Sequence, residues 1–88
     1  MDIKGKTESG FEYSIDPKRL DNYELLEGIA EIEENPTNVP AVLKMLLGTD
    51  QVKKLKEHVR GEDGIVPAEK ILIEIKEIFE NQAQTKNS

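Results

Sequence analysis

Proline and glycine divide this chain into short segments, and their spacing limits what it can fold into. The 88 residues include four prolines and six glycines. Proline is tolerated at the first position of a helix, whereas glycine commonly ends a helix in the left-handed conformation. Pro17, Pro40 and Pro67 therefore mark helix starts, and Asn35-Pro36 and Gly48 mark helix ends. A chain divided in this way can form one small domain of short elements.

Four helices are expected between these marks. Asp16 can cap the first, which extends to about Glu34, and the second runs from Pro40 to Leu47. The third runs from Thr49, its expected cap, to Gly61, and the last from Pro67 to about Glu80. Apolar residues recur at helical spacing in the first and last helices. We expect the core to include Tyr23, Leu25, Leu26, Ile29, Ala30, Ile32, Leu72, Ile75 and Phe79.

The N-terminal segment has the pattern of a β-hairpin. Phe11, Tyr13 and Ile15 alternate with polar residues at the period of a strand, after a turn at Glu8-Ser9-Gly10. We therefore predict a mainly α-helical single domain of about four helices over residues 1–80, with the hairpin at 3–16 and the helices at 17–80. Residues 81–88 are too polar to pack and are predicted to form a flexible tail.

Composition excludes several classes of protein. The chain has 12 Lys and Arg against 18 Asp and Glu, and its net charge of −6 opposes binding to nucleic acid. It has no cysteine, and therefore neither a disulfide nor a thiolate zinc site, as suits a cytosolic protein. It also lacks the roughly 18 consecutive apolar residues of a membrane span. We expect no contact with nucleic acid or membrane.

Few residues offer chemistry. His58 is the only imidazole, and neither a cysteine nor a Gly-x-Ser-x-Gly turn accompanies it, so we expect a structural or solvent-facing role. The turn Gly61-Glu62-Asp63-Gly64 lacks the ligand pattern of a calcium loop, and no glycine-rich phosphate loop is present. We predict a protein without catalytic residues, metal or cofactor.

Two surface features are candidates for partner contacts. Glu24, Glu27, Glu31 and Glu34 form one helical stripe, called here the acidic stripe. It either keeps the protein soluble or faces a basic surface, on a partner or on this chain's own Lys53, Lys54, Lys56 and Arg60. Ile73 projects away from the apolar face of the last helix among charged neighbours. Three interpretations remain open for Ile73: chance exposure, burial under the hairpin, or contact with a partner.

Short motifs in a fixed order extend over nearly the whole chain. The most telling are Ser9-Gly10-Phe11-Glu12, the turn from Arg60 to Pro67, and the terminal Lys86-Asn87-Ser88. The further matching motifs are Lys6-Thr7-Glu8, Tyr13, Ile15-Asp16, Asn22-Tyr23-Glu24-Leu25, Val39-Pro40, Leu46-Leu47-Gly48, His58-Val59 and Glu77-Ile78-Phe79. In these motifs the chain resembles the tail assembly chaperones of long-tailed bacteriophages and prophages of Gram-positive bacteria. It departs from their pattern at Asn22-Tyr23 and at Gly61.

The resemblance implies a function without catalysis. Such chaperones bind the tape measure protein, keep it soluble and help deliver tail tube subunits along it. They act in the cytoplasm of the bacterial host and are absent from the mature virion. A longer product of a −1 ribosomal frameshift is expected to reach the tail tube protein. Self-association also stays open, and Ile73 and the acidic stripe are the contacts inferred from the residues.

A second class of function competes with this one. A small acidic helical protein can act as a regulatory or decoy module that mimics the phosphate spacing of nucleic acid. The acidic stripe supports this alternative. Residues 40–88, however, hold eight bases and eight acids, whereas a mimic would carry acids over most of its surface.

Overall fold

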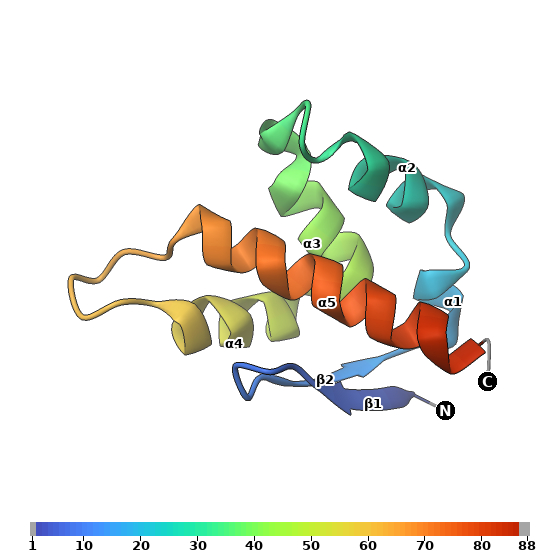
Figure 1. Cartoon of the computed structure of the whole chain (residues 1–88), viewed down its shortest axis with the longest axis horizontal. Helices are drawn as coiled ribbons and strands as arrows, with labels where there is room; N and C mark the ends of the chain where they lie inside the picture. Colours follow the sequence, from blue (N-terminus) through green and yellow to red (C-terminus); the bar gives the residue numbers. More distant parts are fainter. Residues whose placement is uncertain (1, 87–88) are drawn as a thin grey trace.

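The computed structural model describes residues 2–86 as one helical body with an N-terminal hairpin. Figure 1 shows α5 crossing in front of α3, with α4 below α5 and the hairpin at the bottom of the view. The predicted mainly α-helical class with a short hairpin is confirmed. The elements in chain order are β1 (Ile3–Lys6), β2 (Glu12–Ile15), α1 (Pro17–Leu20), α2 (Tyr23–Glu31), the 3₁₀ helix η1 (Pro36–Asn38), α3 (Val39–Leu47), α4 (Thr49–Val59) and α5 (Ala68–Lys86).

The hairpin forms where the alternating pattern predicted it. β1 and β2 pair antiparallel, with Ile3 opposite Ile15 and Gly5 opposite Tyr13. Gly10 turns the chain with a φ of 96°, a conformation that favours glycine. A Cβ at Gly5 would overlap the Tyr13 ring, so glycine lets that ring lie flat across the neighbouring strand. The inward side chains of β2 thereby enter the core.

The outer edge of β2 is closed by a side chain from α4. The Ser14 amide donates to Gln51 Oε1 at 2.7 Å, and Gln51 Nε2 donates back to the Ser14 carbonyl. Gln51 Nε2 also donates to the Leu47 carbonyl at the end of α3. One amide side chain therefore ties together the sheet, α3 and α4.

Helix α3 lies at the centre of the core. It contacts α1, α2, α4 and β2, and its Val42 and Leu46 are fully buried. Gly48 ends α3 with a φ of 83°, as the sequence predicted. Arg19 donates to the carbonyls of Lys44 and Met45 at this helix end, where the Lys44 carbonyl also accepts from the Gly48 amide. The buried apolar residues are Phe11, Tyr13, Ile15, Leu20, Leu25, Ile32, Val42, Leu43, Leu46, Leu47, Leu55, Val59, Ile71, Ile75 and Ile78.

The predicted helix over 17–34 is wrong, because it is two helices and a turn. α1 ends at Leu20, and the Asn22 side chain accepts from the Glu24 amide to cap α2. The chain changes direction between them, so the predicted apolar face is divided. Leu25 and Ile32 are buried, whereas Tyr23, Leu26 and Ala30 are exposed.

The last helix is longer than predicted. α5 continues past Glu80 to Lys86 and Gln82 is buried, so the prediction that the chain stops packing at residue 81 is wrong for Gln82. The rest of the predicted tail, residues 87 and 88, lies outside the described residues. Phe79 and Leu72 only pack against the edge of the core, whereas Ile75 and Ile78 are fully buried. Ile75 and Ile78 are therefore the most deeply buried positions described in α5.

Candidate functional site

Ile73 lies beside a pocket at the meeting point of three elements. The pocket has a volume of about 390 Å³ and is bounded by the hairpin tip, the end of α4 and the first half of α5. Ile73 is 54% exposed, so burial under the hairpin is excluded as an explanation for its position. We call this the cationic pocket, and its lining residues are Ser9, His58, Val59, Arg60, Lys70, Ile73 and Glu74.

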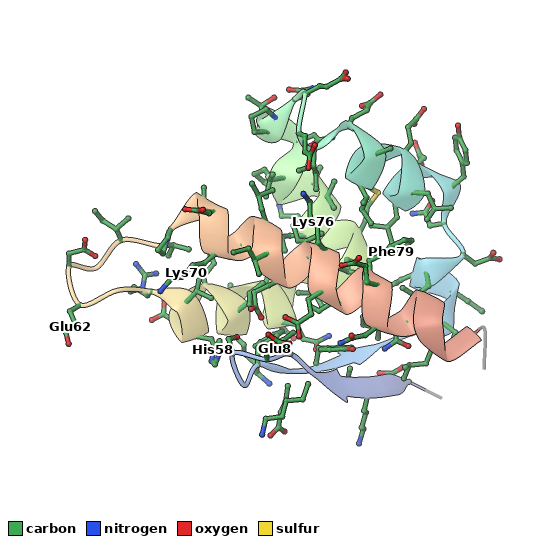
Figure 2. All side chains as sticks on the ribbon, in the orientation of Figure 1. Glu8, His58, Glu62, Lys70, Lys76 and Phe79 are labelled. Atoms are coloured by element: carbon green, nitrogen blue, oxygen red, sulfur yellow. The ribbon has the colours of Figure 1, made fainter. Side chains whose placement is uncertain are left out.

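A hydrogen-bond network fixes the hairpin tip against this pocket. The buried Glu74 carboxylate accepts from the Thr7 hydroxyl at 2.8 Å and from the Ser9 hydroxyl at 2.9 Å. The Glu8 amide donates to the Glu77 carboxylate at 2.6 Å. Hydrogen bonds to a carboxylate are stronger than hydrogen bonds between neutral groups. Both oxygens of the Glu74 carboxylate accept one. Figure 2 shows Glu8 and His58 on the same side of α5, where the tip meets α4.

The network determines which ring nitrogen of His58 carries the proton. His58 Nε2 lies 3.1 Å from the Ser9 carbonyl oxygen and 3.1 Å from the Ser9 hydroxyl. A carbonyl oxygen can only accept, so Nε2 must be the protonated nitrogen of the ring. Since the Ser9 hydroxyl donates to Glu74, His58 is not placed to remove its proton. In this geometry His58 holds the hairpin tip, and its ring contacts Phe11 at a centroid distance of 5.7 Å.

The acidic stripe is exposed, although its last member lies outside the helix. Glu24, Glu27 and Glu31 lie on α2, and Glu34 lies in the following turn. Exposed apolar residues run beside it at helical spacing: Tyr23 is 70% exposed, Leu26 is 41% exposed, and Ala30 follows. We call these three the α2 apolar strip. The prediction counted them as core, because an unbroken helix would have turned them inward.

The acidic stripe does not pair with this chain's own bases Lys53, Lys54, Lys56 and Arg60. The ion pairs among residues 2–82 are Lys76 with Glu33, at 2.6 Å, and Arg60 with Glu57, at 2.7 Å. The hydrogen bond from Lys76 and its charge lower the pKa of the Glu33 carboxyl. Arg60 lowers the pKa of Glu57 in the same way, and Glu57 raises that of Arg60. The acidic stripe is therefore free of ion pairs with the side chains described.

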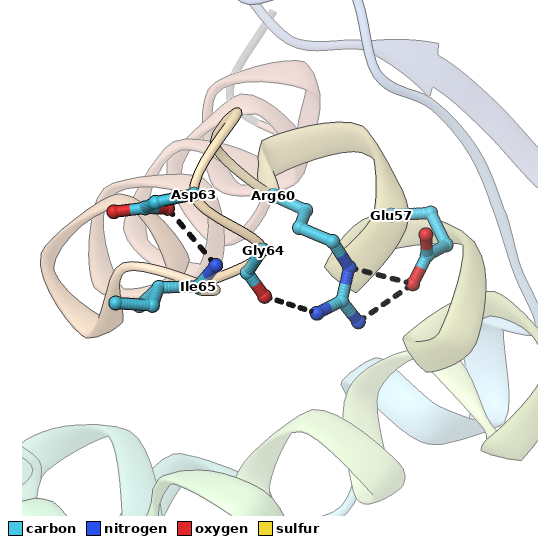
Figure 3. Close-up of polar contacts among 5 residues, drawn as sticks. All are labelled: Glu57, Arg60, Asp63, Gly64 and Ile65. Carbon is cyan, nitrogen blue, oxygen red and sulfur yellow. Dashed lines mark hydrogen bonds and ion pairs between the residues drawn. The ribbon is translucent and has the colours of Figure 1, made fainter.

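The loop between α4 and α5 is a turn, as predicted. Figure 3 shows Arg60 bound to Glu57 and to the Gly64 carbonyl, while the Asp63 carboxylate accepts from the Ile65 amide. Gly64 has a φ of 85°. The turn's carboxylates point to no common centre: the described part of the chain contains no group of three His, Asp or Glu side chains that could hold a metal.

A second concave surface is almost entirely apolar. It has a volume of about 290 Å³ and lies between the start of α3, α4 and the start of α5. Lys56 is the one charged residue on its wall. We call it the apolar groove; its other lining residues are Pro36, Val39, Pro40, Leu43, Val66, Ala68, Ile71 and Leu72. Sequence reasoning missed it, because its wall is assembled from three separate segments of the chain.

The predicted contact residues do not form one surface. Ile73 lies on α5 beside the cationic pocket, and the acidic stripe lies on α2 and the turn after it. The Glu33–Lys76 ion pair links the two regions and contains neither candidate. Glu74 was also missed, because glutamate is normally exposed and its burial depends on Thr7 and Ser9 far away in the sequence.

Comparison of the chain with protein-family models, with curated proteins and with solved structures gives no match. Among the described residues, no helix is long and apolar enough to cross a membrane.

Proposed function

We propose that this protein is a phage tail assembly chaperone that binds the tape measure protein and keeps it soluble in the cytoplasm of the bacterial host. One observation carries the proposal: large apolar side chains are exposed on a charged body whose core is already complete. Tyr23, Leu26 and Ile73 are exposed on helices, whereas Leu25, Ile75 and Ile78 are fully buried. The core therefore does not need the exposed side chains.

This arrangement suits a protein that shields apolar helices. A holdase must offer apolar contact without aggregating, and Tyr23, Leu26 and Ile73 each stand next to a glutamate in the sequence. Leu26 is next to Glu27, and Ile73 is next to Glu74 and one turn from Lys70 and Lys76. The α2 apolar strip, Ile73 and the apolar groove are separate surfaces, and each offers apolar contact to a different amphipathic segment of a long helical protein. In the same proposal, delivery of tail tube subunits uses a longer frameshifted product.

Co-expression with the tape measure protein tests the proposal. The wild-type chain should keep that protein in the soluble fraction. Replacing Ile73 by glutamate should weaken binding by at least about 1 to 2 kcal/mol, because apolar contact is lost and a charge is desolvated. Because Ile73 is exposed, stability should change by only about 0.5 kcal/mol.

A matched variant distinguishes the effect of losing an apolar contact from the effect of adding a negative charge. Ala41 is also exposed on a helix, and Ala41→Glu adds the same charge without removing a large apolar side chain. It should solubilise the tape measure protein as the wild type does. Failure of the wild-type chain to solubilise the tape measure protein would refute the proposed function. Equal solubilisation by wild type and Ile73→Glu would remove Ile73 from the contact surface.

The decoy alternative keeps one supporting observation, the exposed acidic stripe without ion pairs to the described side chains. A decoy would bind a nucleic-acid-binding protein in competition with DNA. Reversing Glu27 and Glu31 to lysine should then abolish binding, whereas a chaperone that also uses apolar contacts should retain part of its affinity.

A further inference from the structure

The cationic pocket is lined by basic side chains, whereas the molecule as a whole has a negative net charge. The chain carries a net charge of −6, yet three basic side chains, His58, Arg60 and Lys70, line this pocket. Its single acid is Glu74, which is 3% exposed and accepts hydroxyl hydrogen bonds at both oxygens. Glu74 is buried, whereas Arg60 and Lys70 are exposed, so the formal charges nearest to an incoming group are positive.

Lys70 supplies the uncompensated part of this charge. Arg60 is already paired with Glu57 and donates to the Gly64 carbonyl. Lys70 has no ion-pair partner among the side chains of residues 2–82. His58 uses Nε2 for Ser9, which leaves Nδ1 without a hydrogen bond in the described chain. A carboxylate at the pocket would gain Lys70 as a counter-charge.

The pocket also offers apolar contact and a fixed shape. Ile73 and Val59 line it, and its volume of about 390 Å³ leaves room for a large apolar side chain. The bonds from Thr7 and Ser9 to Glu74 hold the hairpin wall in place, so the site is formed before binding. A preformed site binds with a smaller entropic cost than one that must be ordered.

We propose that the cationic pocket binds an amphipathic helical segment of a partner protein through a large apolar side chain and a carboxylate one turn away. Residues four apart lie on the same face of a helix, so both groups can enter together. A basic segment is disfavoured by Lys70. Identifying the partner as the tape measure protein rests on the proposed function; the chemistry of the pocket does not.

A synthetic helix provides the probe. The peptide has about 16 residues, mostly alanine and glutamine, with one leucine and a glutamate four positions later, a length at which isolated helices begin to be stable. Amide chemical shifts of the nitrogen-15-labelled chain are followed as the peptide is added. We expect shifts at Val59, Lys70 and Ile73, and binding about threefold to tenfold weaker when the peptide's glutamate is replaced by lysine.

A pair of charge reversals completes the test. Lys70→Glu should weaken binding of the glutamate peptide about threefold to tenfold, whereas Lys53→Glu, on the exposed face of α4, should leave it unchanged. Equal binding of the two peptides, or shifts confined to another surface, would overturn the proposal. Pocket signals that move with protein concentration alone would show that a second copy occupies the pocket, and this too would overturn it.

The outcome is separable from that of the proposed function. If the wild-type chain solubilises the tape measure protein but does not bind the peptide, only the pocket proposal is wrong. If the peptide binds with the expected charge preference but the tape measure protein stays insoluble, the pocket proposal stands and the proposed function fails.

Discussion

The Gln82 side chain donates a hydrogen bond to the Tyr13 hydroxyl at 3.0 Å, across 69 positions of the sequence. Both residues are buried, Tyr13 at 3% exposure and Gln82 at 6%. The contact joins the far end of α5 to the inward face of β2. Gln82, beyond the predicted end of the last helix, therefore belongs to the folded domain.

Truncation tests this contact directly. Ending the chain after Glu80 removes Gln82 and leaves the Tyr13 hydroxyl buried without this partner, which should lower the free energy of unfolding by about 1 to 3 kcal/mol. Ending it after Gln82 keeps the hydrogen bond and should cost clearly less. Urea denaturation of the two truncated chains gives the comparison, and equal stability would show that residues 81 and 82 contribute nothing.

Replacing Glu74 by alanine should loosen the hairpin. The Thr7 hydroxyl is buried with its residue at 4% exposure and would lose an acceptor, so we expect a loss of about 1 to 3 kcal/mol. Glu69→Ala, on the exposed side of the same helix, should stay within about 0.5 kcal/mol of the wild type. Thermal melts measure both, and faster amide hydrogen exchange in the hairpin should accompany the Glu74 change alone.

Gly28 marks the closest approach of α2 to α3. A Cβ there would lie 2.7 Å from Cγ2 of Val42, which is fully buried. Alanine favours a helix over glycine by about 1 kcal/mol, but the overlap should outweigh this, so Gly28→Ala should lower stability by a net of about 1 kcal/mol.

A double-mutant cycle checks the cause. In a Val42→Ala background the overlapping methyl is absent, so Gly28→Ala should become neutral or stabilising. If Gly28→Ala costs the same in both backgrounds, overlap with Val42 is not the reason for the glycine.

Acid should weaken the Glu33–Lys76 pair in a defined pH range. Because the pKa of Glu33 is lowered in the folded state, the stabilisation is present above the ordinary glutamate pKa and is lost as the pH falls through the lowered value. In Lys76→Gln the pKa of Glu33 should return toward its ordinary value. The pKa of Glu57, whose partner is Arg60, should stay lowered, and carboxyl-carbon NMR titration follows both.

The gene should contain a slippery heptamer near its end. Thr85-Lys86-Asn87 can be encoded as ACA-AAA-AAC, which contains A-AAA-AAC, where a ribosome can slip into the −1 frame. Reading the nucleotide sequence is sufficient. Synonymous codons that break the heptamer, or an absent overlapping frame, would remove this support for the chaperone family.

Local signals in the sequence predicted the elements that local chemistry determines. The alternation of Phe11, Tyr13 and Ile15 predicted the hairpin. Asp16-Pro17 predicted a helix start, and the Asp16 side chain accepts a hydrogen bond from the Lys18 amide there. Gly48 ended a helix as expected. In each case the cause lies within a few residues.

The wrong predictions depend on distant contacts or on competing local signals. Asn22 had the chemistry of a helix cap, but the apolar pattern around it continued at helical spacing and masked the break. Burial of Glu74 and Gln82 depends on Thr7 and Tyr13, which are more than sixty positions away. No pattern within α5 contains that information. The exposed strip of Tyr23, Leu26 and Ala30 follows from the same missed break.

The side-chain amide of Gln51 blocks one edge of the two-stranded sheet. An uncovered strand edge is a template on which further strands, including those of other copies, can be added. At β2 the Ser14 amide and carbonyl are already occupied by Gln51, so growth from this edge would first require α4 to release it. The other edge belongs to β1, where Lys4 and Lys6 are exposed and like charges oppose stacking of copies. Each edge of the hairpin thus carries its own obstacle to the addition of a further strand.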